Sequence, residues 1–165
     1  MAEFPEQFDP ENPPASLEDL GSAIGGDPVR ETRFNRLLIE AAEFTTEEPN
    51  YAHRAVALLV LLGLSTVVSA NWDDCVERAA VELRGKITPT VTANDRRKLK
   101  WHQGFHKVHG CANYEDSLLV SKEALKEPPD WVAKAVGADI GTETLVFVGL
   151  ATVGDYHRGR LLSSG

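Results

Sequence analysis

Cysteine and basic residues are both scarce in this sequence of 165 residues, and each shortage excludes a class of protein. Cys75 and Cys111 are too few for a disulfide framework and lack CxxC spacing, so we expect reduced thiols in a cytoplasmic protein. The 25 acidic residues outnumber the 17 basic ones and give a net charge of −8. Because a protein that binds a phosphate backbone needs a basic face, we expect no nucleic-acid partner.

The sequence also predicts neither a leader peptide nor a membrane-spanning helix. Residues 1–5 do not place a basic segment before an apolar one, so we expect no signal peptide. The uncharged run over residues 55–72 is interrupted by Gly63 and by several hydroxyl side chains. A spanning helix needs roughly 20 mostly apolar residues. We therefore expect no membrane partner.

The same uncharged run predicts a helix followed by a strand. Residues 52–62 are rich in Ala and Leu and predict a buried helix that ends at Gly63. Residues 64–70 are rich in Val and Thr, which predicts a strand buried on both faces. Further strands are predicted over residues 105–109, 117–120 and 145–150.

Capping residues mark the starts of other helices. Ser16, with Asp19 three residues later, predicts one helix start, and Asp27 before Pro28 predicts the next. The second of these helices is expected to face the core with an apolar stripe formed by Phe34, Leu37, Leu38 and Ala41. Two more helices are expected to begin after Asp74 and after Ser121.

The order of these elements predicts the fold class. Residues 1–15 are acidic and rich in proline, which predicts a flexible lead-in before a single domain over residues 16–165. Hydrophobic strands that alternate with helices indicate an α/β fold, a parallel sheet with helices on both faces. Ligands of such sheets bind beyond the carboxyl ends of the strands. The loops expected there are residues 70–74, 109–111 and 149–155.

Three segments at these strand ends resemble sirtuin-like domains. Residues 67–74, Val-Val-Ser-Ala-Asn-Trp-Asp-Asp, are similar to the family's strand that ends in Asn, an aromatic residue and Asp. Residues 107–110, Lys-Val-His-Gly, are similar to its Lys-Leu-His-Gly segment, and residues 145–150 to its Leu-Phe-Val-Gly segment. The motifs follow the family's order within residues 53–158. The resemblance implies a Rossmann-like, sirtuin-like fold with NAD as substrate or ligand.

The resemblance also implies roles for individual residues. Asn71 matches the asparagine that contacts the nicotinamide ribose, and His109 matches the histidine that acts as general base. Asp73 matches the aspartate that helps to hold the nicotinamide. The remaining cofactor-binding residues that it implies are Gly110, Gly149 and Thr152, the last as a substitute for a family serine that is replaced here by Ala151.

These roles imply cleavage of the bond between nicotinamide and ribose. Water as the nucleophile gives NAD hydrolysis, and an acyl-lysine gives deacylation. Two cysteines cannot build the four-cysteine zinc module of the deacetylases, so the resemblance favours the zinc-free, NAD-hydrolysing branch found in bacterial defence systems, with no metal at the site.

One departure from the family leaves other functions open. Its first strand and glycine-rich loop are absent, and residues 21–26 do not follow a hydrophobic strand and cannot replace them. We therefore expect an incomplete sirtuin-like domain, and a truncated or inactive binding module is an alternative to the enzyme. An open sheet edge would favour self-association or contact with further domains.

Simpler explanations exist for each site residue. Asn71 is typical of a turn, His109 can be structural, Asp73 can serve as a helix cap, and Gly149 can mark a tight turn. A rival zinc site is also conceivable, because four of the ligands that zinc accepts lie within ten positions. They are His102, His106, His109 and Cys111.

Overall fold

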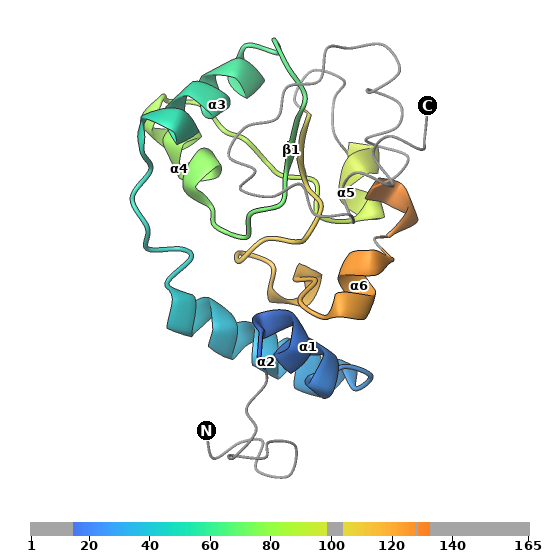
Figure 1. Ribbon diagram of the computed structural model, residues 1–165. Coiled ribbons are helices and arrows are strands. Elements are labelled where there is room, and N and C mark those ends of the chain that lie inside the picture. The colour runs from blue at the N-terminus through green and yellow to red at the C-terminus, as the bar shows by residue number, and fades with distance from the viewer. Residues whose placement is uncertain (1–14, 99–103, 128, 133–165) are drawn as a thin grey trace.

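The computed structural model describes residues 15–98, 104–127 and 129–132 (Figure 1). It is a mixed α/β structure, as predicted. The helices are α1 (Leu17–Ile24), α2 (Pro28–Ala42), α3 (Tyr51–Leu61), α4 (Cys75–Glu82), α5 (Ala93–Lys98) and α6 (Lys122–Lys126). The strands are β1 (Val67–Ser69) and β2 (Phe105–Lys107), and a 3-10 turn, η1, covers Glu115–Ser117.

The two strands form a parallel sheet, which confirms the predicted strand direction. Val67 pairs with Phe105 and Ser69 with Lys107. Thr90 forms a parallel bridge with His106 on the other side of β2. In Figure 1, α3 and α4 lie on one side of the strands and α5 on the other. Among the described residues, no strand pairs with the outer edge of β1.

The predicted helix starts are confirmed at atomic detail. The Ser16 hydroxyl accepts a hydrogen bond from the Asp19 amide at 3.1 Å, and Asp27 accepts from two amides of the first turn of α2. Ser121 caps α6 through the amide of Ala124. These bonds satisfy amides that a helix leaves without a partner in its first turn.

Two hydrophobic clusters hold the described elements together. The first fills the space between α3, α4 and the strands with Ala57, Val60, Ala79, Ala80, Ile87 and Phe105. The second joins α1 and α2 to the chain around α6 through Ile24, Phe34, Leu118 and Val120. Trp72, which follows β1, packs against the second cluster, so the loop after β1 connects the two.

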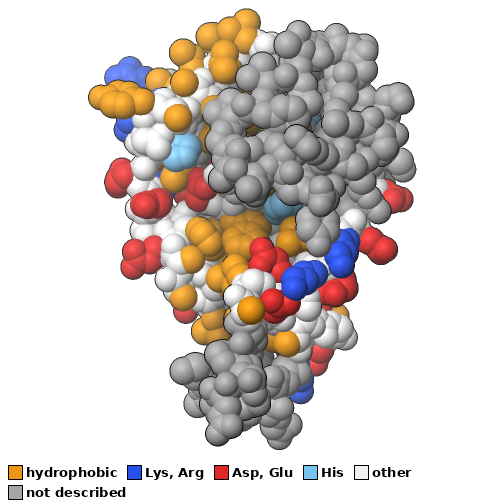
Figure 2. All heavy atoms as spheres, in the orientation of Figure 1, with side chains coloured by type: hydrophobic (Ala, Val, Ile, Leu, Met, Phe, Trp, Pro, Cys, Tyr) orange, Lys and Arg blue, Asp and Glu red, His pale blue; other side chains and the backbone are white. Residues whose placement is uncertain are grey.

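The predicted burial of β1 and α3 is wrong in part. Only one face of β1 lies against the first cluster, and the Val68 side chain remains 41% exposed. In α3, Ala57 and Val60 are buried, whereas Leu58 is 47% exposed. Figure 2 shows hydrophobic side chains gathered over α3 and the segment that follows it. Because the helix packs through one stripe only, the Leu58 and Leu59 side chains on its other side meet solvent.

Two further predictions need correction. In α2, Leu37 and Ala41 are exposed, because the buried face passes through Phe34 and Asn35 instead. Residues 117–120 do not form a strand, because η1 turns the chain there. The Ser117 hydroxyl donates to the Tyr114 carbonyl at 2.6 Å and closes that turn. The predicted strand over residues 145–150 lies outside the described residues.

Within the described part of the chain, no helix combines the length and the apolar character that a membrane crossing requires.

Candidate functional site

The loops after β1 and β2 adjoin at the carboxyl end of the sheet. The Val108 amide donates to the Ser69 carbonyl at 3.0 Å, which extends the strand pairing by one residue. Beyond it, the Trp72 indole donates to the His109 carbonyl at 2.9 Å, and the Ala112 amide donates to the Trp72 carbonyl at 2.8 Å. These bonds bring together residues 70–74 and 108–112, two of the three loops expected at the site.

Four of the expected site residues lie on these two loops. Asn71 is exposed, and its backbone amide donates to the Ser69 hydroxyl at 3.1 Å. His109 is half-buried, and its carbonyl also accepts from the Leu119 amide at 2.9 Å. The other two are Asp73 and Gly110, whereas Gly149 and Thr152 lie outside the described residues.

Gly110 has a backbone conformation that excludes other residues. Its φ is +96°, in the left-handed region that side chains disfavour. A Cβ at this position would lie 2.2 Å from the Ser117 carbonyl oxygen. The sharp turn after His109 therefore needs glycine for structural reasons, independently of any ligand.

A buried ion pair between Lys107 and Glu77 lies next to the loop after β1. Lys107, the last residue of β2, is 1% exposed, and its ammonium lies 3.0 Å from Glu77 Oε1 on α4. The ammonium also donates to the Asp73 carbonyl and, at 3.3 Å, to the Cys111 sulfur. Burial raises the pKa of Glu77, while Lys107 opposes that shift. Lys107 thus ties the loop after β1 to β2 and α4.

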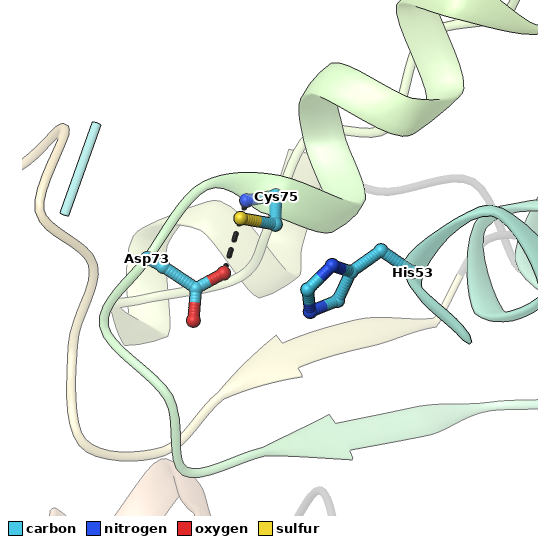
Figure 3. A group of neighbouring side chains, drawn as sticks. All are labelled: His53, Asp73 and Cys75. Carbon is cyan, nitrogen blue, oxygen red and sulfur yellow. Dashed lines mark hydrogen bonds between the residues drawn. The ribbon is translucent and has the colours of Figure 1, made fainter. Parts of the chain in front are cut away.

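The Asp73 side chain belongs to a second group of neighbouring side chains. His53, Asp73 and Cys75 each present a potential ligand atom, and these atoms lie within 4.8 Å of one another (Figure 3). The Cys75 amide donates to Asp73 Oδ1 at 3.0 Å. Burial, followed by the hydrogen bond to Asp73, raises the pKa of the Cys75 thiol to about 11.

Sequence reasoning missed both groups. The sequence assigns Asp73 to the cofactor and places Lys107 in a motif, whereas their partners Glu77 and His53 come from helices at other positions in the chain. The adjacency of Asp73 and Cys75 was the one available signal. The rival zinc set of His102, His106, His109 and Cys111 gains no support, because the group that lies close enough to share an ion among the described residues is a different one. His102 lies outside those residues.

An open cleft of about 540 Å³ lies beside the loop after β2. It is lined by Val91, Thr92, Asp95 and residues 112–117. Its three carboxylates, on Asp95, Glu115 and Asp116, would repel the pyrophosphate of a dinucleotide. The cleft is therefore a poor phosphate site, although it borders the same loop.

Comparison with protein families identifies a matching domain family. The family described as the SIR2-like domain matches residues 65–155, more than half of the 165 residues. The matched region begins just before β1 and includes β2 and both adjoining loops. No curated protein matches the chain.

Proposed function

Because the chain belongs to the SIR2-like domain family, we propose that it binds NAD beside the loops after β1 and β2 and cleaves the bond between nicotinamide and ribose. The observation that supports this proposal best is the junction of the two loops. Two hydrogen bonds hold the Asn71 loop against the His109 loop, and a third joins the end of β1 to Val108, where a parallel sheet binds its ligands.

The residues present suit this substrate. The exposed Asn71 can offer its amide to the ribose or to an attacking water. His109, in its neutral form, can accept a proton from a ribose hydroxyl or from that water. Asp73 lies on the same loop, and the family resemblance assigns it to holding the nicotinamide end of the cofactor. NAD itself supplies a cationic leaving group.

Backbone contacts would keep these side chains in place. The His109 carbonyl accepts two hydrogen bonds, and Lys107 donates to the Asp73 carbonyl. Both catalytic candidates therefore belong to loops that are fastened to the sheet. We propose, from the family resemblance alone, that Gly149 and Thr152 complete the cofactor-binding set.

A fluorescent NAD analogue tests the reaction. The purified chain is incubated with etheno-NAD, whose fluorescence rises when nicotinamide leaves. We expect His109→Ala and Asn71→Ala to lower the rate at least ~100-fold, the usual contribution of a positioned proton acceptor or donor. Asn94→Ala, an exposed asparagine on α5, is the matched control and should keep the full rate. An unchanged rate in His109→Ala would reject its catalytic role.

A binding module without turnover is the second candidate. Residues 21–26 belong to α1 and its carboxyl-terminal cap, and Gly21 packs against the backbone of Val120 and Ser121. They therefore do not form a phosphate-binding loop. Calorimetric titration with ADP-ribose separates the candidates: binding without cleavage of etheno-NAD supports the module. If neither binding nor cleavage is seen, both are rejected. Release of an acyl group from an acyl-lysine peptide would indicate deacylation instead.

A further inference from the structure

Three side chains with different donor atoms meet between α3, α4 and the loop after β1. His53 comes from the first turn of α3, Asp73 from the loop, and Cys75 from the first residue of α4. Figure 3 shows the three side chains directed toward one another. Their ligand atoms lie within 4.8 Å of one another. We propose that this group binds a divalent transition-metal ion, with zinc as the best match.

The donor set selects the class of ion. Imidazole nitrogen, thiolate sulfur and carboxylate oxygen together suit zinc and its borderline neighbours. Calcium and magnesium take oxygen ligands, so the sulfur of Cys75 disfavours them. Around one zinc ion, ligand atoms stand about 3.3–3.7 Å apart, because zinc–ligand distances are about 2.0–2.3 Å. Small side-chain rotations would bring the group to that spacing, and water would complete the coordination.

Arg78 is the neighbour of Cys75 that favours a bound thiolate. Arg78 Nη2 lies 3.7 Å from the sulfur and can donate to it, while Arg78 Nε is held by Asp74 at 2.8 Å. The Cys75 thiol donates to the Glu47 carbonyl at 3.7 Å, and this contact ends when the ion replaces the proton. The Cys75 proton leaves to solvent when the ion binds. Since His53 and Asp73 are half-buried rather than sealed, an ion can reach the group.

An existing hydrogen bond of His53 also opposes binding. His53 Nδ1 accepts a hydrogen bond from the Asn50 amide at 3.2 Å, as part of the cap of α3. Coordination through Nε2 would place the ring proton on Nδ1, and coordination through Nδ1 would use its lone pair. Either mode ends this contact. The loss is one long hydrogen bond, and Asn50 Oδ1 keeps its own bonds to the helix.

Cobalt and zinc titrations test the site on the full chain without a histidine tag. After treatment with a chelator, one Co²⁺ per chain should bind and produce a thiolate-to-cobalt charge-transfer band in the near ultraviolet. Zn²⁺ should remove the band. A competing chromophoric chelator gives the zinc affinity, which we expect to fall at least tenfold in Cys75→Ser and in His53→Ala. This test does not depend on NAD binding or cleavage.

Cys111→Ser is the matched control, because Cys111 contacts Lys107 and Glu77 instead of this group. It should keep both the band and the affinity. The proposal is overturned by the absence of a thiolate band, by a band that survives Cys75→Ser, or by a band lost in Cys111→Ser. Should Cys75→Ser not fold, an unchanged zinc affinity in His53→Ala, with wild-type circular dichroism, gives the same rejection.

Discussion

At the scale of single residues, Gly110 and Gly26 share a backbone conformation but not an environment. Their φ angles are +96° and +95°. A Cβ on Gly26 would meet nothing within 4 Å, whereas one on Gly110 would meet the Ser117 carbonyl at 2.2 Å. Substitutions at the two glycines therefore distinguish the free-energy cost of a left-handed backbone from the cost of a steric clash.

Substitution of both glycines by alanine measures that difference. Gly26→Ala should lower the free energy of unfolding by about 1 kcal/mol, the cost of left-handed backbone alone. Gly110→Ala should cost at least ~3 kcal/mol, because the loop after β2 must also move. Urea denaturation measures both values. Equal losses would show that the Ser117 contact is easily relieved.

The buried Lys107–Glu77 pair is the other residue-scale feature whose contribution to the free energy of unfolding can be measured. Lys107→Met leaves a buried carboxylate without its cation, and we expect a loss of about 3–5 kcal/mol in unfolding free energy. Arg54→Met is the matched control, because Arg54 forms an exposed pair with Glu82 and its replacement should cost much less. Urea denaturation of both variants tests this, and a Lys107 loss as small as the control would contradict it.

At the scale of elements, α3 shows how one cap serves structure and chemistry together. Asn50 Oδ1 accepts from the amides of Ala52 and His53, and the His53 ring accepts from the Asn50 amide. This reciprocal capping box fixes the start of α3 where it meets α4. The cap thus also sets the position of His53 beside Asp73 and Cys75.

Removal of that cap should weaken the helix measurably. Asn50→Ala is expected to lower the free energy of unfolding by about 1 kcal/mol, because two amides lose their acceptor. Asn50→Asp keeps an acceptor oxygen and should stay within a few tenths of a kcal/mol of the wild type. Thermal unfolding followed by circular dichroism measures both. A wild-type midpoint for Asn50→Ala would show that the cap contributes nothing.

At the scale of the whole molecule, polar contacts join α1 and α2 to the chain after β2. Asn35 is buried, and its amide donates to the Glu115 carbonyl at 2.9 Å. Arg36 reaches the side chain of Glu115 at 2.7 Å from the surface. Both contacts come from α2 and act on η1, which follows the Gly110 turn, so α2 supports the region of the candidate site.

The buried contact should matter more than the exposed one. Asn35→Ala should cost about 1–3 kcal/mol of unfolding free energy, because buried carbonyls lose their donor. Arg36→Ala should cost less than Asn35→Ala, because water and salt screen the exposed pair. Urea unfolding at low and high salt checks this. A larger loss of unfolding free energy in Arg36→Ala than in Asn35→Ala would show that the exposed contact contributes more than the buried one.

The sequence by itself determined where several helices begin and which two segments form β1 and β2. Ser16, Asp27 and Ser121 cap helices because a side-chain oxygen needs only the next few amides as partners. The Val-rich segment before Asn71 and the segment before His109 became neighbouring parallel strands. The loops that carry the sirtuin-like motifs were therefore predictable, while the chemical roles of Asn71 and His109 stay predictions.

Only the tertiary structure decided which faces are buried and which distant side chains meet. The Val68 side chain is exposed although it lies in an apolar segment, because burial depends on what packs against each face of the strand. Glu77 reaches Lys107, and His53 reaches Cys75, through helices packed from separate parts of the chain. Such contacts depend on the relative placement of whole elements, which no local pattern specifies.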